Sequence, residues 1–286
     1  MPELPEVETV ANDLNQYLRG KIIARLELIG RHSLVKNSWP DFKKSLQGKK
    51  VLKVYRRAKM IVVALESGYL LFHLKMTGQL IYVLKKSLVA GGHPIASTGV
   101  AVPNKFTRLI FHFKNGGVLY FNDIRKFGWV KFLKNEAFEA LDKATGLEPL
   151  SKEFTFKRFE EILQRRSRTS LKAALLDQKH LVGLGNIYVD EVLYNAGLSP
   201  KRLAGSLKEK EKIKLFKAIP LILKKSIARR GTTFSDFLDA QGRQGGFAAL
   251  LKVYGRASLA CPRCGAPIIK SRLAGRGTHW CKNCQK

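Results

Sequence analysis

Four cysteines near the end of the printed sequence have the spacing of a metal site. They form two Cys-x-x-Cys pairs, Cys261 with Cys264 and Cys281 with Cys284, separated by sixteen residues. Each pair can bring two sulfur atoms to one ion, and four thiolates are the ligand set of a structural zinc site. Such a site has no open coordination position, so we expect one structural Zn2+ per chain. Two redox-active pairs are the disfavoured alternative, because a redox Cys-x-x-Cys normally opens a helix after a strand.

The first residues, MPELPEVET, could carry a different chemistry. A small residue after Met1 permits removal of that methionine, which would convert Pro2 into a secondary α-amine. An α-amine has a pKa of about 7.7–8.0, so a fraction is neutral at pH 7 and can form a Schiff base with an electrophilic carbon. Glu3 and Glu6 are close enough in sequence to transfer protons. On the residues alone, an ordinary helix start is the better interpretation, because the helix dipole favours carboxylates there.

Positive charge dominates the composition. The 286 residues include 52 Lys and Arg against 22 Asp and Glu, a net charge of +30. A surface this basic attracts a polyanion, most often nucleic acid, although a solubility charge or a ribosome- or membrane-adhering surface has the same composition. No apolar run approaches the roughly 18 residues of a transmembrane helix, and the acidic start lacks the order of a signal peptide. With the cysteines confined to one region, this favours a cytoplasmic protein.

The elements that must position these groups change along the chain. Residues 1–20 have apolar side chains at helical spacing and end at Gly20, which predicts an N-terminal helix. Residues 22–133 contain short runs rich in Val, Ile, Leu, Tyr and Phe, which predict an antiparallel β-sandwich or barrel. The stretch 85–105 has no period and is expected to be a long loop.

Helical patterns follow the strands. Ser206 and Glu209 predict a capping box at the start of the last helix, and Pro220 is expected to kink that helix or shift its start. We therefore expect a multidomain α+β fold, with an N-terminal β-sandwich domain, a helical domain and a C-terminal zinc ribbon. The predicted helices span 154–166, 169–178, 186–196 and 206–229, and the predicted domains span 1–134, 135–231 and 232–286.

An ordered set of motifs resembles the formamidopyrimidine-DNA glycosylase family over essentially the whole chain. The opening PELPEVET is followed by matching motifs and then by the cysteine pairs. These motifs are RRAKM (56–60), HLKMTG (73–78), NDIRKFGW (122–129), DQKHLVGLGNIYVDEVLYNAGLSP (177–200) and VYGR (253–256). The resemblance implies a monomeric, bacterial-type enzyme that binds damaged double-stranded DNA, excises oxidised purines such as 8-oxoguanine and formamidopyrimidines, and cleaves the abasic strand by β,δ-elimination. It implies no organic cofactor, and it identifies 135–231 as a helix–two-turn–helix DNA-binding domain.

The resemblance also implies roles for residues around the N-terminus. Pro2 matches the family's nucleophile, which attacks the sugar C1′, and Glu3 matches the glutamate that assists proton transfer. Lys59 matches a lysine that contacts phosphate beside the lesion and helps elimination. Glu6 is expected to shape the site. These matches favour the Schiff-base interpretation over the ordinary helix start.

Other matches imply DNA contacts. A flipped-out nucleotide leaves a gap in the duplex, and intercalating side chains fill such gaps. By similarity, Met76, Arg125 and Phe127 fill the gap, although periodicity alone would place Met76 and Phe127 in the core. The remaining matches are Asn186 and Arg276 as phosphate contacts, Lys172 near the flipped base, and Glu191, which faces the site or is an exposed helix carboxylate.

The sequence departs from the family pattern at several places. Lys75 and Ile124 stand where the family commonly has glycine and proline, TGLEPL (145–150) differs from LGPEPL, and RRGTT (229–233) differs from the commoner GGTT. Two other functions remain as alternatives: an endonuclease VIII-like glycosylase for oxidised pyrimidines, and a non-catalytic DNA- or RNA-binding protein on the same scaffold. The Met-Arg-Phe set and Leu4 disfavour the first, and Pro2, Glu3 and Lys59 together disfavour the second.

Overall fold

The fold is described from a computed structural model of residues 1–286. It describes all of them except 31–33, 85–86, 93–101, 115 and 234–244. The chain divides into two units, Met1–Ala144 with Arg229–Gly246, and Thr145–Ala228 with Phe247–Lys286.

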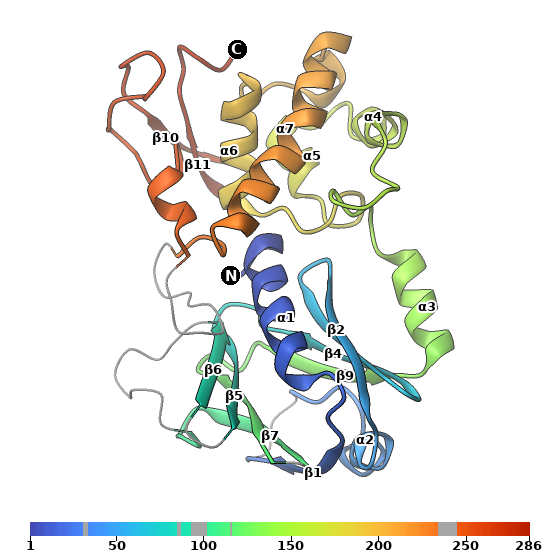
Figure 1. The fold of residues 1–286 in the computed structure, drawn as a ribbon. Coiled ribbons are helices and arrows are strands. Elements are labelled where there is room, and N and C mark those ends of the chain that lie inside the picture. Colours follow the sequence, from blue (N-terminus) through green and yellow to red (C-terminus); the bar gives the residue numbers. More distant parts are fainter. Residues whose placement is uncertain (31–33, 85–86, 93–101, 115, 234–244) are drawn as a thin grey trace. The chain divides into compact units, whose positions relative to one another are not determined.

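The first unit is built on two antiparallel sheets, with strand orders β1-β7-β8-β5-β6 and β2-β3-β4-β9. Helix α1 packs against β2 and β3 (Figure 1). The helices of this unit are α1 (Leu4–Leu18), α2 (Trp39–Leu46) and α3 (Asn135–Ala144), and its strands are β1 (Ile23–Leu28), β2 (Val51–Arg57), β3 (Met60–Leu65), β4 (Gly68–His73), β5 (Gly78–Leu84), β6 (Ser87–Gly92), β7 (Thr107–Phe113), β8 (Val118–Asp123) and β9 (Trp129–Leu133).

The core of the first unit lies between the two sheets. The ring of Phe72 on β4 has its centroid 5.7 Å from that of Phe111 on β7 and 6.0 Å from that of Phe121 on β8. The apolar face of α1 closes the same core with Val7, Val10, Leu14 and Leu18. The predicted N-terminal helix and antiparallel β-sandwich are therefore confirmed.

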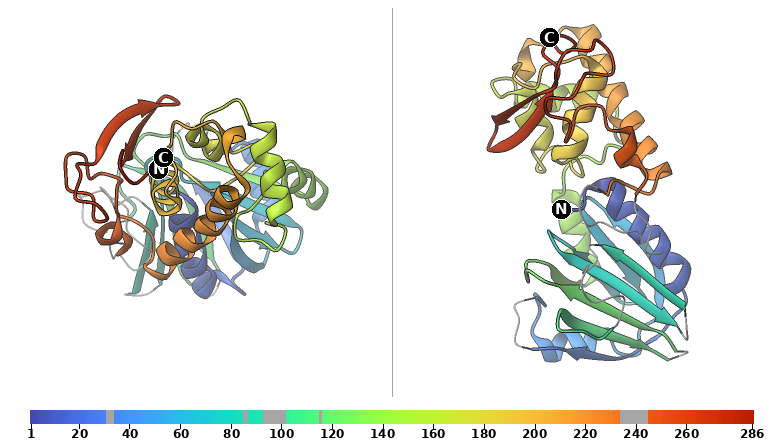
Figure 2. Two further views of the ribbon diagram at one scale, coloured as in Figure 1. Left: turned by 90° about the horizontal axis from the view of Figure 1, so that it is seen from above. Right: turned by 90° about the vertical axis from the view of Figure 1, so that its left-hand side faces the viewer.

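The second unit combines helices with a small hairpin. Helix α6 packs against α5, α7 and β11, so it is the central element (Figure 2). Helix α7 has 20 residues but is not apolar enough to cross a bilayer, and none of the other described helices is both long and apolar enough to do so. The elements are α4 (Phe156–Arg165), α5 (Leu171–Leu176), α6 (Asn186–Ala196), η1 (Ala204–Ser206), α7 (Glu209–Ala228), η2 (Phe247–Leu250), β10 (Ile269–Leu273) and β11 (Arg276–Trp280).

Several element boundaries differ from the prediction. The short helices α2 and α3 were missed, and Ser87–Gly92 of the expected loop 85–105 is strand β6, paired with β5. The predicted capping box of α7 is wrong. Ser206 lies in η1 and donates its hydroxyl to the Leu203 carbonyl. Helix α7 begins at Glu209, and the amide of Lys208, the residue before it, donates to the Glu211 carboxylate. Helix α7 runs through Pro220 without a new start there.

Packing assigns helix α3 and the cysteine module to different units. Helix α3 belongs to the first unit because Phe138 stacks on Tyr69 of β4, with ring centroids 3.8 Å apart. The cysteine module belongs with the helices because Cys261 and Cys281 share a core with Tyr194 of α6.

Candidate active site and nucleic-acid interface

The N-terminal turn of α1 is fixed by its own acidic residues. Glu3 is the N-cap residue and forms a capping box with Glu6, in which the Glu3 amide donates to Glu6 Oε2 at 2.8 Å. The other oxygen of Glu6 accepts the Thr232 amide at 2.8 Å. Glu6 therefore holds both the turn that follows Pro2 and the segment Arg229–Thr233, which agrees with a shaping role. Pro2 itself is buried.

Charges around the chain start act on its amino group. Burial lowers the pKa of the Met1 amine below its usual value of 8.0, Glu3 and Glu6 oppose that shift, and Lys59 adds to it. Lys59 lies in the two-residue turn between β2 and β3, where Ala58 takes a φ of 53°, a conformation that tight hairpin turns require. The structure thus brings Lys59, which is 8% exposed, into electrostatic reach of the N-terminus.

A histidine not identified from the sequence lies in the same region. Burial, followed by the charges of Lys75 and Lys59, lowers the pKa of His73 to about 3. Its Nδ1 accepts the Lys75 amide at 3.0 Å, so the neutral ring carries its proton on Nε2. The signal was present in the sequence, because His73 opens the HLKMTG motif.

The three residues expected to fill a gap in DNA are on the surface of the first unit. Met76 is 41% exposed and Phe127 is 55% exposed, so the periodicity that would bury them is misleading. The Arg125 guanidinium lies 4.8 Å from the centre of the Phe127 ring. Exposed apolar side chains beside a cation are the kind of group that enters a base stack.

Lys172 and Glu191 have buried partners in the second unit. Lys172 is fully buried, and its Nζ donates to Asp190 Oδ1 at 2.7 Å and to the Gly277 carbonyl at 3.1 Å. Glu191 is not an exposed helix carboxylate. It is 2% exposed and accepts the backbone amides of residues 252, 253 and 254 at 2.9–3.0 Å. Burial raises the pKa of Glu191, and these amides oppose the rise. Both side chains therefore join helices to neighbouring segments.

Asn186 and Arg276 lie at the surface expected to meet phosphate. Asn186 is the first residue of α6, and the first amides of a helix have no intrahelical acceptor and attract anions. Its side-chain amide donates to the Gly277 carbonyl at 2.9 Å, which links α6 to the hairpin. Arg276 is exposed at the start of β11, beside the hairpin turn.

The four cysteines fit a zinc ion. Their sulfur atoms all lie within 4.8 Å of one another, and the Sγ pairs Cys264–Cys281 and Cys261–Cys284 are 3.5 and 3.8 Å apart. A tetrahedral ion with Zn–S bonds of about 2.3 Å needs sulfurs about 3.8 Å apart. The donor set and its spacing therefore match one structural Zn2+.

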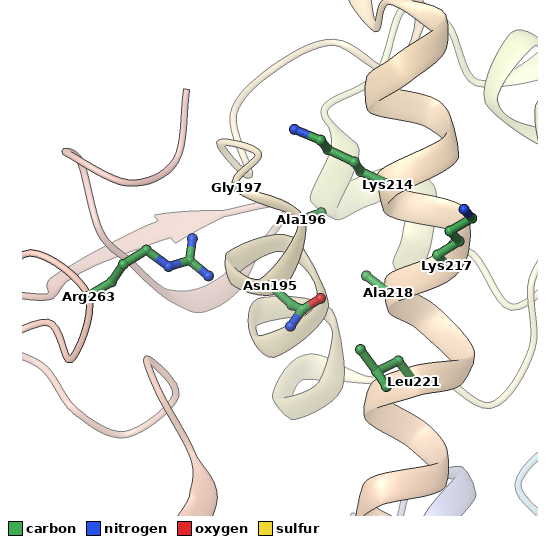
Figure 3. Close-up of a pocket in the computed structure, with 8 residues that line it drawn as sticks. All are labelled: Asn195, Ala196, Gly197, Lys214, Lys217, Ala218, Leu221 and Arg263. Atoms are coloured by element: carbon green, nitrogen blue, oxygen red, sulfur yellow. The ribbon is translucent and has the colours of Figure 1, made fainter.

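A depression of about 440 Å³ lies elsewhere on the second unit, between the C-terminal end of α6 and α7 (Figure 3). It contains none of the residues singled out from the sequence. Its lining consists of Asn195, Ala196, Gly197, Lys214, Lys217, Ala218, Leu221 and Arg263.

Comparisons with known proteins agree with this architecture. Family models match in order: the formamidopyrimidine-DNA glycosylase N-terminal domain (residues 1–130), its H2TH domain (145–237) and the zinc finger found in FPG and IleRS (258–286). Formamidopyrimidine-DNA glycosylases of Pelotomaculum thermopropionicum and Carboxydothermus hydrogenoformans are 40% and 42% identical, each over 100% of this chain and 99% and 100% of their own.

Solved structures with the same fold contain damaged DNA. A Lactococcus lactis Fpg (MutM) in complex with DNA containing N7-benzyl-Fapy-dG has a TM-score of 0.85 and 34% identity, with 100% of both chains covered. A MutM in complex with DNA containing carbocyclic 8-oxo-G has a TM-score of 0.86 and 34% identity, again with 100% of both chains covered. On the motifs, the fold and these full-length similarities, the chain belongs to the formamidopyrimidine-DNA glycosylase family.

Proposed function

We propose that this protein excises oxidised purine bases, 8-oxoguanine and formamidopyrimidines, from duplex DNA and then cleaves the abasic strand. Pro2, exposed by removal of Met1, is the nucleophile. The relatives' names and the Fapy-dG and 8-oxo-G complexes of the solved structures support this substrate class. We place the protein in the cytoplasm, at the DNA it repairs, because a net charge of +30 favours lasting association with DNA.

The chemistry assigns one task to each residue near the chain start. The Pro2 nitrogen attacks the sugar C1′, the bond from C1′ to the base breaks, and Glu3 assists the proton transfers that release the base and open the sugar. The resulting Schiff base acidifies the neighbouring C2′ hydrogen, so β-elimination and then δ-elimination break the strand on both sides. Lys59 binds the phosphate beside the lesion and stabilises its charge.

One observation carries this proposal. Burial lowers the pKa of the Met1 amine, one residue before the Pro2 nitrogen, and Glu3, Glu6 and Lys59 are the charges that act on it, so removal of Met1 would leave the Pro2 amine beside the same groups. A lowered pKa increases the neutral fraction of an amine, and only a neutral amine is nucleophilic. Pro2 is buried in the same region, and Glu6 fixes the turn that follows it.

The second unit supplies binding in this proposal. The first turn of α6 at Asn186, together with Arg276, holds the DNA backbone, and the zinc keeps the hairpin folded. Because the zinc is coordinated by four protein sulfurs, it contributes structure and leaves the reaction to the protein's own groups.

Borohydride trapping tests the nucleophile. We expect wild type to form a covalent adduct with duplex DNA containing 8-oxoguanine opposite cytosine, and Pro2→Gly to lose most excision and trapping while it still binds damaged DNA. A control is Pro5→Ala, which changes the nearby proline in the first turn of α1 and should retain trapping. A variant that keeps Met1 should behave like Pro2→Gly, because its Pro2 nitrogen is in a peptide bond.

The same assay separates the competing functions. Wild-type rates of trapping by the variant that keeps Met1, whose Pro2 nitrogen is in a peptide bond, would show that the nucleophile is another group. A preference for oxidised pyrimidines over 8-oxoguanine would favour the endonuclease VIII-like function, and binding without any adduct would favour a non-catalytic DNA-binding protein.

A further inference from the structure

Two loops of the first unit carry the three side chains expected to fill the gap in DNA. The loop between β4 and β5 carries Met76, and the loop between β8 and β9 carries Arg125 and Phe127. Strands β5 and β8 are antiparallel neighbours, and Gly78 pairs directly with Asp123. Both loops therefore meet at the same end of one strand pair.

The carboxylate of Asp123 joins these loops. It is 1% exposed. Its Oδ1 accepts the Thr77 hydroxyl, from the residue after Met76, and the Arg125 amide at 3.2 Å. Its Oδ2 accepts the Gly128 amide at 2.7 Å, from the residue after Phe127. The Asp123 carboxylate thus accepts hydrogen bonds at, or one residue after, each of the three exposed side chains.

Neighbouring contacts make this junction tight. The Arg125 amide lies 3.0 Å from the Thr77 hydroxyl oxygen as well, so the two loops are also joined directly. A methyl group added at Gly128 would lie 2.9 Å from Asp123 Oδ2, which leaves no room for a side chain there.

The backbone of both loops is held in a costly conformation. Lys75 and Lys126 have φ values of 51° and 57°, which residues other than glycine rarely adopt. Such backbone persists only where its surroundings determine it. The three side chains are exposed and offer the backbone little support, whereas hydrogen bonds to a buried charge can hold it.

We propose that Asp123 is the positioning residue that holds Met76, Arg125 and Phe127 in one fixed arrangement for insertion into the DNA. This inference rests on the proposed function. Asp123 touches no substrate and acts through the loops. Loss of its bonds would leave the three side chains present but not aligned, so flipping of a paired base would suffer while the chemistry at Pro2 would not.

The test compares two substrates that differ in their need for base flipping. Asp123→Asn keeps the shape but replaces one accepting oxygen with a donor, and Thr77→Val removes the hydroxyl with little change in volume. We expect Asp123→Asn to slow single-turnover excision of 8-oxoguanine from duplex about tenfold or more, because a hydrogen bond to a charged group is lost. Cleavage of a preformed abasic site should change less than about threefold, because no paired base is displaced.

A second arm shows that Asp123 acts through the inserted side chains. In a Met76→Ala/Phe127→Ala background, Asp123→Asn should slow excision less than about threefold further, because coupled residues are non-additive. Thr77→Ser should restore what Thr77→Val loses. Asp142→Asn is the control, since Asp142 also accepts from an arginine of this unit but lies on α3, outside both loops, and it should retain wild-type rates on both substrates.

Three results would overturn the proposal: equal slowing on both substrates, full additivity in the double-alanine background, or unchanged duplex excision by Asp123→Asn. If Asp123→Asn fails to fold, the valine and serine variants at Thr77 carry the test. Failure of wild type to act on either substrate would instead remove the proposed function, so the two failures are distinguishable.

Discussion

Replacing Lys172 with methionine should destabilise the second unit strongly. Methionine keeps the length of the apolar stem and removes the charge. Lys172 and Asp190 are both fully buried, with Nζ and Oδ1 2.7 Å apart, and Asp190 Oδ2 also accepts the His279 amide at 2.8 Å. Removing one partner of a buried ion pair costs about 3–5 kcal/mol, because the other charge stays buried and uncompensated. That is a large part of a typical domain stability of about 5–15 kcal/mol.

Lys212 offers a matched control. Its Nζ lies 2.7 Å from Glu160 Oε1, the same separation, but the two side chains are 25% and 39% exposed. Surface pairs of this kind contribute about 0–1 kcal/mol. Urea titration of wild type, Lys172→Met and Lys212→Met, followed by the fluorescence of Trp280 in a background where Trp39 and Trp129 are phenylalanine, reports unfolding of the second unit alone.

The resemblance placed Lys172 near the flipped base, and the same variants decide between that role and a structural one. We expect Lys172→Met to lose several kcal/mol of unfolding free energy, and Lys172→Met/Asp190→Asn to recover part of it, because no buried charge is then left alone. If instead Lys172→Met unfolds like Lys212→Met and its single-turnover excision on saturating DNA is much slower, the structural reasoning is refuted and the lysine acts on the lesion.

Three further outcomes follow from the site. Cys264→Ser should lower the amount of bound zinc per chain and weaken binding to all duplexes alike, because the hairpin that carries Arg276 folds with its ion. Metal analysis measures the zinc and fluorescence polarisation the DNA affinity, and a zinc-free protein with full affinity would contradict this. His73→Asn should make the free energy of unfolding less dependent on pH. Below pH 6.5 the unfolded imidazole gains a proton that the folded one, with a pKa of about 3, does not, so wild type loses stability as the pH falls. Urea midpoints of both proteins between about pH 7 and 4 measure this, and an equal pH dependence in the two would show that His73 is exposed. Lys75→Gly should raise stability by up to about 1 kcal/mol in thermal denaturation, because glycine removes the strain of a φ of 51° but adds unfolded-state entropy; a loss of stability would show that the lysine side chain contributes packing.

Local patterns predicted the elements whose burial is regular. Helix α1 presents apolar residues every three or four positions, and the strands of the first unit alternate or run apolar, so the N-terminal helix and the strand-rich region after it were predicted correctly. Helix α2 buries only Phe42 and Leu46, too few to form a period, although Ser38 caps it and Pro40 lies in its first turn. The start of α7 was placed early because the Ser206 hydroxyl bonds backward, to the Leu203 carbonyl.

The functional residues divide in the same way. Spacing alone predicted the cysteine cluster, because both pairs are local in sequence. The environments of Lys172 and Glu191 could not be predicted, since their partners lie 18 to 105 residues away and exist only in the fold. Periodicity would have buried Met76 and Phe127, and it fails there because loop residues follow no period.

The closed cysteine cluster leaves the protein without a spare thiol. All four cysteines of the chain belong to the zinc site, where a bound metal occupies every sulfur. A cysteine introduced at an exposed position would therefore be the single target for a maleimide dye while the metal stays bound. Placed at Lys126, between Arg125 and Phe127, such a dye would report insertion into DNA in real time, with Met76, Arg125 and Phe127 left intact.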